Sequence, residues 1–192
     1  MVLLAPGELA VLKPERYEDT WDWCGLLARD YVTARFPLTA TVLDVGACWG
    51  KYRHLLPHYP AMDACEAWEP YVEAEDLRAL YRHVFLADIC ELVTSPDWHG
   101  YDLVIMGDVL EHIRRDRAQA MLGTLLATCG DVIAAVPYEY EQGPEHGNHY
   151  QRHLQADLTP DLMAAEYPGL VLLDTEYRRG KPFKGLYARK DA

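Results

Sequence analysis

The segment Thr41–Leu56 constrains the fold more strongly than any other part of the chain. It starts with the apolar run Val42–Val45, which is typical of a buried strand, and continues into a turn with Gly46 and Gly50 before residues that favour a helix from Lys51. Glycine lets the backbone pass close to a ligand, because it has no Cβ and tolerates positive φ angles. The unpaired N–H groups of a helix start would face the same ligand. The segment therefore predicts the first strand–turn–helix unit of a nucleotide-binding α/β domain.

The residues from Asp44 to Gly50 read D-V-G-A-C-W-G. This pattern resembles motif I of the class I S-adenosylmethionine (SAM)-dependent methyltransferases, which usually reads D-x-G-x-G-x-G. It departs from the family at Cys48, which occupies the place of the middle glycine. The alternative is a strand–turn–helix unit that binds no ligand. The resemblance implies SAM as the cofactor, S-adenosylhomocysteine as its product, and cofactor contacts from Asp44, Gly46, Ala47, Cys48 and Gly50.

Composition and charge narrow the class of protein. With 192 residues, half of them hydrophobic and a quarter charged, the chain suits a single globular domain. Its net charge of −12 argues against a nucleic-acid partner, since phosphate backbones bind clustered Lys and Arg. No apolar run reaches the roughly 20 residues of a membrane span, and the N-terminus lacks the basic start of a signal peptide. The five cysteines form no C-x-x-C pair, so we expect reduced thiols in a cytoplasmic protein.

The N-terminal part of the domain predicts a helix over Pro14–Arg35, with apolar side chains at steps of three and four. Aromatic residues at this spacing usually pack on a sheet, as we expect for Trp21 and Trp23. Alternatively, Tyr17 or Trp21 covers the cofactor, as N-terminal helices do in many members of the family. We therefore divide the domain into a helical lid, residues 1–38, and a Rossmann-like core, residues 39–192.

The second predicted strand covers residues 61–69 and ends in an acidic residue before Pro70. A carboxylate at such a strand end can accept both ribose hydroxyls of a cofactor. Glu66 and Glu69 both lie at a suitable spacing from the glycine turn. We choose Glu69, followed by Pro70, as the ribose-binding pair, because Glu69 ends the apolar run. A solvated carboxylate at the strand end is the alternative.

The third predicted strand lies within His83–Leu92 and ends near Asp88. The resemblance implies that Asp88 binds the adenine amino group and that Ile89 packs against the ring. Asp88 could also cap a following helix, and the two roles are compatible.

The segment Gly100–Ile113, GYDLVIMGDVLEHI, resembles motif IV of the same family, in which a buried strand ends in a polar residue and a helix with the pattern vLEHi follows. The resemblance implies that Asp108 and Val109 line the methionine end of SAM. It also makes His112 a candidate general base, since an imidazole titrates near neutral pH. The alternative is a histidine bonded within the first turn of that helix.

A histidine-rich loop, residues 138–157, follows the predicted strand Asp131–Val136. His149 and His153 would share one face of a helix and could bind a metal ion, but glycines and a proline break any helix here, so we predict no metal site. The family places a substrate loop at this position, and a polar surface loop is the alternative. The candidates in it are His146 and His149 for catalysis, and Tyr150, Arg152 and His153 for the acceptor.

Two strand-like runs, Gly169–Tyr177 and Gly185–Arg189, flank a basic turn, Arg178–Lys184, and predict a terminal hairpin. The predicted fold is α/β: a Rossmann-like, mostly parallel seven-stranded sheet with an antiparallel last strand pair and helices on both faces.

The predicted function is transfer of the SAM methyl group to oxygen or nitrogen of a small-molecule or sugar-containing acceptor. Catalysis would rest mainly on alignment of the acceptor and exclusion of water. One alternative is a module that binds SAM or a nucleotide without catalysis. Another is an NAD-dependent oxidoreductase, although that class usually shows G-x-G-x-x-G.

Overall fold

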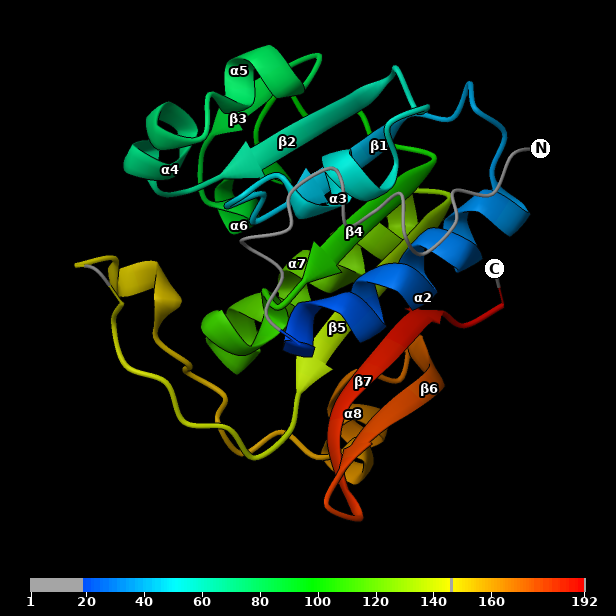
Figure 1. Ribbon diagram of the computed structural model, residues 1–192, viewed down its shortest axis with the longest axis vertical. Helices are drawn as coiled ribbons and strands as arrows, with labels where there is room; N and C mark the ends of the chain where they lie inside the picture. Colours follow the sequence, from blue (N-terminus) through cyan, green and yellow to red (C-terminus); the bar gives the residue numbers. More distant parts are fainter. Residues whose placement is uncertain (1–18, 146, 192) are drawn as a thin grey trace.

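A single seven-stranded sheet forms the centre of the computed structural model, which describes residues 19–145 and 147–191 and, for 19–23, the backbone only (Figure 1). The strand order is β3-β2-β1-β4-β5-β7-β6. The strands are β1 (Val42–Val45), β2 (Met62–Glu66), β3 (Val84–Leu86), β4 (Leu103–Gly107), β5 (Asp131–Pro137), β6 (Leu170–Arg178) and β7 (Lys181–Arg189). This is the predicted α/β architecture, with five parallel strands and an antiparallel last pair.

The helices connect these strands and cover both faces of the sheet (Figure 1). They are α2 (Asp19–Arg35), α3 (Lys51–Leu55), α4 (Glu69–Ala74), α5 (Leu77–Leu80), α6 (Ile89–Leu92), α7 (Arg115–Thr128) and α8 (Pro160–Glu166), with short 3-10 turns η1 (Leu110–His112) and η2 (His149–Gln151). Within the described residues no helix is long and apolar enough to cross a bilayer. Tyr17, the first predicted lid residue, lies outside the described part, as does the side chain of Trp21.

Strand β1 is the point at which the chain changes direction across the sheet. It pairs in parallel with β2 on one side and with β4 on the other. All four residues of β1 are buried, as the uninterrupted run Val42–Val45 predicts for a strand covered on both faces. In parallel sheets, ligands bind outside the carboxyl ends of the strands at such a switch point. The turn after β1 therefore opens where a ligand site is expected.

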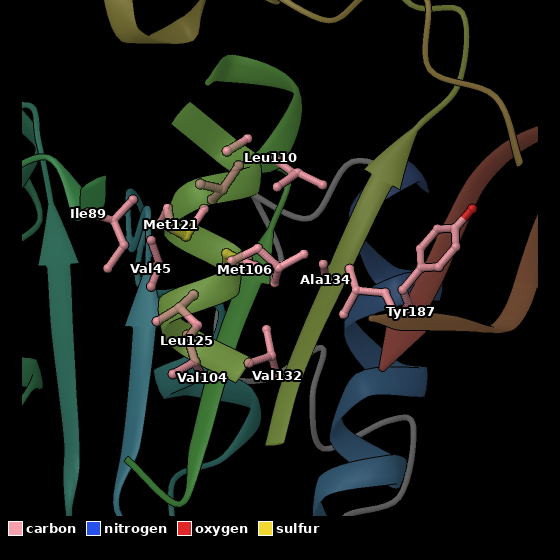
Figure 2. Packing of buried hydrophobic residues seen from close by; sticks show 14 of the residues in the cluster. Val45, Ile89, Val104, Met106, Leu110, Met121, Leu125, Val132, Ala134 and Tyr187 are labelled. Carbon is pink, nitrogen blue, oxygen red and sulfur yellow. The ribbon is translucent and has the colours of Figure 1, made fainter. Parts of the chain in front are cut away.

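The core has two layers, one on each face of the sheet, because successive strand residues point to opposite faces. Val42, Leu103 and Ile105 pack with α2 and α3. Val104 and Met106 point the other way, against α6 and α7. Figure 2 shows Met121 and Leu125 of α7 lying over the second layer. The strands are thus packed on both faces of the sheet, which fixes the positions of their carboxyl ends.

Four boundaries differ from the sequence predictions. Strand β2 ends at Glu66 instead of Glu69, and β3 ends at Leu86 and gives way to α6. The last part of motif IV forms the 3-10 turn η1 instead of the predicted helix. The predicted basic turn Arg178–Lys184 is also wrong, because β6 and β7 are joined only through Arg179 and Gly180. Both of these residues have positive φ angles, 49° and 77°, as a tight two-residue hairpin requires.

Candidate functional site

The turn after β1 lies at the carboxyl ends of the strands and contains several residues with positive φ angles. Gly46 has a φ angle of 65°, and a Cβ atom there would lie 2.7 Å from Cγ2 of Val109. Glycine is therefore required at this position by both conformation and space. Gly50 also has a positive φ angle, 71°, where the chain enters α3. The two glycines that the sequence singled out thus shape the turn.

Cys48 adopts a φ angle of 46°, the left-handed conformation that a glycine would take more easily. A non-glycine residue in this region costs about 1 kcal/mol. The backbone N–H of Cys48 donates to Oε2 of Glu66 at 3.0 Å, which helps to hold the turn. Burial raises the pKa of the Cys48 thiol far above its ordinary value, so the group stays protonated and is a poor nucleophile.

The carboxyl end of β2 places the side chain of its last residue, Glu66, in the cleft. Glu66 is 6% exposed, and its Oε1 accepts a hydrogen bond of 2.8 Å from the N–H of Trp68. Burial raises its pKa, although hydrogen bonds from backbone N–H groups oppose this. Glu69 and Pro70, by contrast, begin α4, are exposed, and lie outside the cleft lining. The strand thus ends earlier than predicted, and it places Glu66 instead of Glu69 in the cleft.

Asp88 and Ile89 lie after β3, where the sequence predicts the adenine-binding residues. Oδ1 of Asp88 accepts a hydrogen bond of 2.8 Å from the N–H of Cys90, so Asp88 caps α6 as expected. Its Oδ2 accepts from Arg117 at 3.2 Å. Ile89 is buried beside Val45 (Figure 2). Asp88 and Ile89 both line the cleft.

Asp108, directly after β4, lies between two lysines. Its φ angle is 59°, its Oδ2 is 3.5 Å from Nζ of Lys51, and its Oδ1 forms an ion pair with Nζ of Lys184. Burial alone would raise the pKa of Asp108, but the charges of Lys184 and Lys51 outweigh it and hold the pKa below its usual value. Both lysines are at least nine-tenths buried. The three side chains together carry one net positive charge on the floor of the cleft.

The loop after β5 crosses the same edge of the sheet (Figure 1, yellow) and is tied down near its end. Gln155 is 2% exposed, and its amide NH2 donates to the carbonyls of Leu110 and Ile113, at 2.9 Å each. The loop forms the turn η2 at its far side, where Asn148 accepts from the N–H of Tyr150. Of the predicted acceptor residues, Arg152 and His153 thereby contact motif IV, whereas Tyr150 stacks on His149.

Glu111, His112 and His153 come together where this loop meets η1. Nε2 of each histidine lies 3.9 Å from Oε1 of Glu111, which is 1% exposed. Burial, and to a lesser extent His153, lowers the pKa of His112 to about 4, so its imidazole is neutral at physiological pH. The alternative of a motif IV histidine bonded within the first turn of its helix does not match the structure, because Nδ1 of His112 lies 3.2 Å from the carbonyl oxygen of Arg152 in the loop.

These groups enclose a cleft of about 1100 Å³. Of the residues predicted from the sequence, those that line it are Asp44, Gly46, Ala47, Cys48, Asp88, Ile89, Asp108, Val109, His112, His149, Tyr150 and His153. Gly50, Glu69, Pro70 and Arg152 do not line it, and His146 lies outside the described residues.

Several lining residues were not identified as site residues from the sequence. Lys51 follows the glycine turn directly, and a cation at that helix start was a usable signal. Trp49 and Tyr71 form part of the cleft wall, with ring centroids 5.3 Å apart. Lys184 was predicted to lie in a basic turn, and no local pattern indicated that β7 carries it into the cleft.

Comparison with known proteins supports the fold. No protein-family model matches the sequence, and neither does any curated protein. Among solved structures, the N-terminal domain of EvdMO1, determined in the presence of S-adenosylhomocysteine and D-fucose, matches with a TM-score of 0.63 and 18% identity over 96% of this chain and 94% of that one. A SAM-dependent methyltransferase from Clostridium acetobutylicum matches with a TM-score of 0.64 and 12% identity over 96% of both chains.

A third structural neighbour is an N1-methyltransferase from Burkholderia thailandensis with 1,6-didemethyltoxoflavin and S-adenosylhomocysteine bound. Its TM-score is 0.61 and its identity 21%, over all of this chain and 93% of that one. Two of these neighbours are methyltransferases and the third was determined with S-adenosylhomocysteine, which agrees with the resemblance of motifs I and IV. The sheet order, the glycine turn and the matches over most of the chain together show that this protein has the Rossmann-like α/β fold of the SAM-dependent methyltransferases.

Proposed function

We propose that this protein transfers the methyl group of SAM to oxygen or nitrogen of a small-molecule or sugar-containing acceptor. The observation that supports this most is the convergence of the glycine turn, Glu66 and Asp108 in one cleft at the carboxyl ends of β1, β2 and β4. A non-catalytic binding module needs no acceptor loop, and an NAD-dependent oxidoreductase usually carries G-x-G-x-x-G, whereas this turn has Gly46 and Gly50 with three residues between them. The neighbours' small ligands, D-fucose and 1,6-didemethyltoxoflavin, suit an acceptor of similar size here.

The residues present fit the cofactor. Gly46 leaves the space that a Cβ atom would fill, so the backbone can approach a ligand closely. Each oxygen of Glu66 accepts one backbone hydrogen bond and keeps a lone pair, which suits the two ribose hydroxyls. Asp88 and Ile89 would contact the adenine. The net positive charge of Asp108, Lys51 and Lys184 suits the carboxylate of the methionine part.

SAM supplies a methyl group on a positively charged sulfur, from which a nucleophile displaces it. The protein then has to align the acceptor and exclude water. Trp49, Tyr71, His149 and Tyr150 line the outer part of the cleft, where their rings would cover a bound acceptor. His112, His146 and His149 are the candidate bases for an acceptor that must lose a proton.

The test is calorimetric titration with S-adenosylhomocysteine of the wild type and of a matched pair of variants. Glu66→Ala removes the cleft carboxylate, whereas Glu69→Ala removes an exposed one outside it. We expect binding by the wild type and by Glu69→Ala, and a loss of at least about tenfold in Glu66→Ala, since hydrogen bonds to a charged group contribute about 1.5–3 kcal/mol. NAD+ should not bind. A folded wild type that binds no S-adenosylhomocysteine would refute the proposal.

A further inference from the structure

Three side chains with chelating atoms converge beside the acceptor part of the cleft. Glu111 and His112 belong to η1, and His153 belongs to the loop after β5. One carboxylate oxygen and one nitrogen from each ring all lie within 4.8 Å of one another. Packing from two elements that are distant in sequence produces this cluster, which the pattern of histidines along the loop did not indicate.

Backbone carbonyls determine the tautomers of the two imidazoles. Nδ1 of His153 is 2.7 Å from the carbonyl oxygen of Tyr140, and Nδ1 of His112 is 3.2 Å from that of Arg152. Since a carbonyl oxygen only accepts hydrogen bonds, each Nδ1 carries the proton and each Nε2 has a free lone pair. A second hydrogen bond of this kind orients most histidines that bind metal ions in proteins.

The carboxylate between the rings is buried without a donor. Neither oxygen of Glu111 accepts a hydrogen bond from another residue in the described part of the chain. The two Nε2 atoms face it at 3.9 Å, which is too far for a hydrogen bond. Three acceptors thus surround a common point. Burial of unpaired polar groups is costly, so such an arrangement calls for a cation or an added proton.

We propose that Glu111, His112 and His153 bind one divalent transition-metal ion as a two-histidine, one-carboxylate site. Imidazole ligands favour ions such as Zn²⁺, Co²⁺ or Fe²⁺ over Mg²⁺ and Ca²⁺, which prefer oxygen ligands. A tetrahedral ion at the usual bond lengths needs ligand atoms about 3.3 Å apart. The two observed 3.9 Å distances are longer than this by about 0.6 Å, so the three side chains must move closer together by at least that amount to bind the ion.

Three protein ligands leave at least one coordination position for another molecule. All three side chains line the cleft, so an acceptor hydroxyl could occupy that position. A bound divalent ion lowers the pKa of such a hydroxyl. The O–H bond would break with release of the proton to solvent, the oxygen–methyl bond would form, and the sulfur–methyl bond would break to leave S-adenosylhomocysteine. This role rests on the proposed function, whereas metal binding itself does not.

In the experiment, EDTA-treated, reduced protein of the full 192 residues is titrated with Zn²⁺ and with Co²⁺. Calorimetry measures the binding of both ions, and the visible spectrum measures that of Co²⁺. The test variants are Glu111→Gln and His153→Gln, and the matched control is His99→Gln, an exposed histidine outside the cleft lining. We expect one ion per chain in the wild type and in the control. Affinity should fall by at least about hundredfold in each test variant, since changing even an outer partner of a ligand costs 10–100-fold. Mg²⁺ should not bind.

Circular dichroism and S-adenosylhomocysteine titration on the same samples separate the outcomes. Absence of Zn²⁺ and Co²⁺ binding in a wild type that binds S-adenosylhomocysteine overturns the metal site and leaves the proposed function standing. Binding that survives both substitutions, or a Co²⁺ spectrum with thiolate charge-transfer bands, places the ion elsewhere and also overturns it. Metal binding that both substitutions abolish in folded protein supports the site, even where S-adenosylhomocysteine fails to bind and the methyltransferase proposal falls.

Discussion

Replacement of Gln155 by leucine should release the acceptor loop from motif IV. The glutamine amide joins three elements: its NH2 group donates to two carbonyls near η1, and its Oε1 accepts from the hydroxyl of Tyr167 at 2.8 Å and from Nε of Arg115 at 3.2 Å. It is 2% exposed, so water does not replace these partners easily. Leucine has a similar volume and no polar atom, and therefore removes the hydrogen bonds without leaving a large cavity.

The size of the effect follows from the groups that lose a partner. Each buried group left unpaired costs about 1–3 kcal/mol, and Gln155→Leu takes this partner from the carbonyl of Ile113 and the hydroxyl of Tyr167. The carbonyl of Leu110 keeps a hydrogen bond from the N–H of Ile113. Arg115 loses less, because it keeps its ion pair with Asp157 at 2.8 Å. We expect a total loss of about 3 kcal/mol in the free energy of unfolding. Tyr167→Phe removes a single hydrogen bond and should cost about 1 kcal/mol.

The four proteins to compare are the wild type, Gln155→Leu, Tyr167→Phe and the double variant. Urea unfolding monitored by circular dichroism gives the free energy of unfolding of each. In the double variant the hydroxyl that Gln155→Leu leaves unpaired is absent, so the combined loss should be smaller than the sum by about 1 kcal/mol. A loss below about 1 kcal/mol for Gln155→Leu, or strictly additive losses, would show that the amide does not tie the loop to η1.

Two further predictions concern the turn and the strand below it. Gly46→Ala should lower the free energy of unfolding by about 2 kcal/mol and the affinity for S-adenosylhomocysteine at least tenfold, because a side chain at φ 65° is strained and meets Val109. Adding Val109→Ala should recover only the part of the loss that comes from the steric clash. Full recovery of the melting temperature would contradict the argument from backbone strain. Asp44 faces Tyr81, Lys51 and Glu66, and burial raises its pKa to about 7. The folded state therefore holds a proton that the unfolded state has lost between about pH 4 and 7, so stability from this group falls as the pH rises through that range, by an amount on the order of 4 kcal/mol. Asp44→Asn should remove this slope in urea unfolding measured from pH 5 to 8, and an unchanged slope would refute the assignment.

Local patterns predicted most of the fold because its elements are locally determined. The buried run of β1, the glycine turn and the Asp88 cap each depend on residues within one short segment, and each is present. The seven-stranded sheet and its antiparallel last pair came from the resemblance, and the structure has both. The errors lie at ends of elements. Ala67 and Trp68 continue the apolar residues of β2 in sequence, which made Glu69 the predicted strand end. The strand ends instead at Glu66, whose carboxylate accepts a hydrogen bond from the N–H of Trp68.

The side chains that give the cleft its chemistry could not be assigned from local patterns, because their roles arise from pairs of distant segments. The sequence shows Glu111 and His112 as neighbours, and shows His149 and His153 at helical spacing, which favoured grouping the two loop histidines. In the structure His149 instead stands edge-on to Trp68, with ring centroids 5.9 Å apart, and His153 meets Glu111. The loop backbone decides this, since the N–H groups of Leu154 and Gln155 both donate to the carbonyl of Glu111.

The same holds for Lys184, which lies in a segment that reads as a basic turn. Two positive φ angles at residues 179 and 180 allow a two-residue hairpin, and this shortening moves Lys184 into β7. There it pairs with Pro137 in the register of β5 and β7, next to the carboxyl end of β5, and reaches Asp108. A buried lysine is tolerated at that point because a buried carboxylate pairs with it. The charge of the cleft floor is therefore set by the conformation of a turn at the far end of the chain.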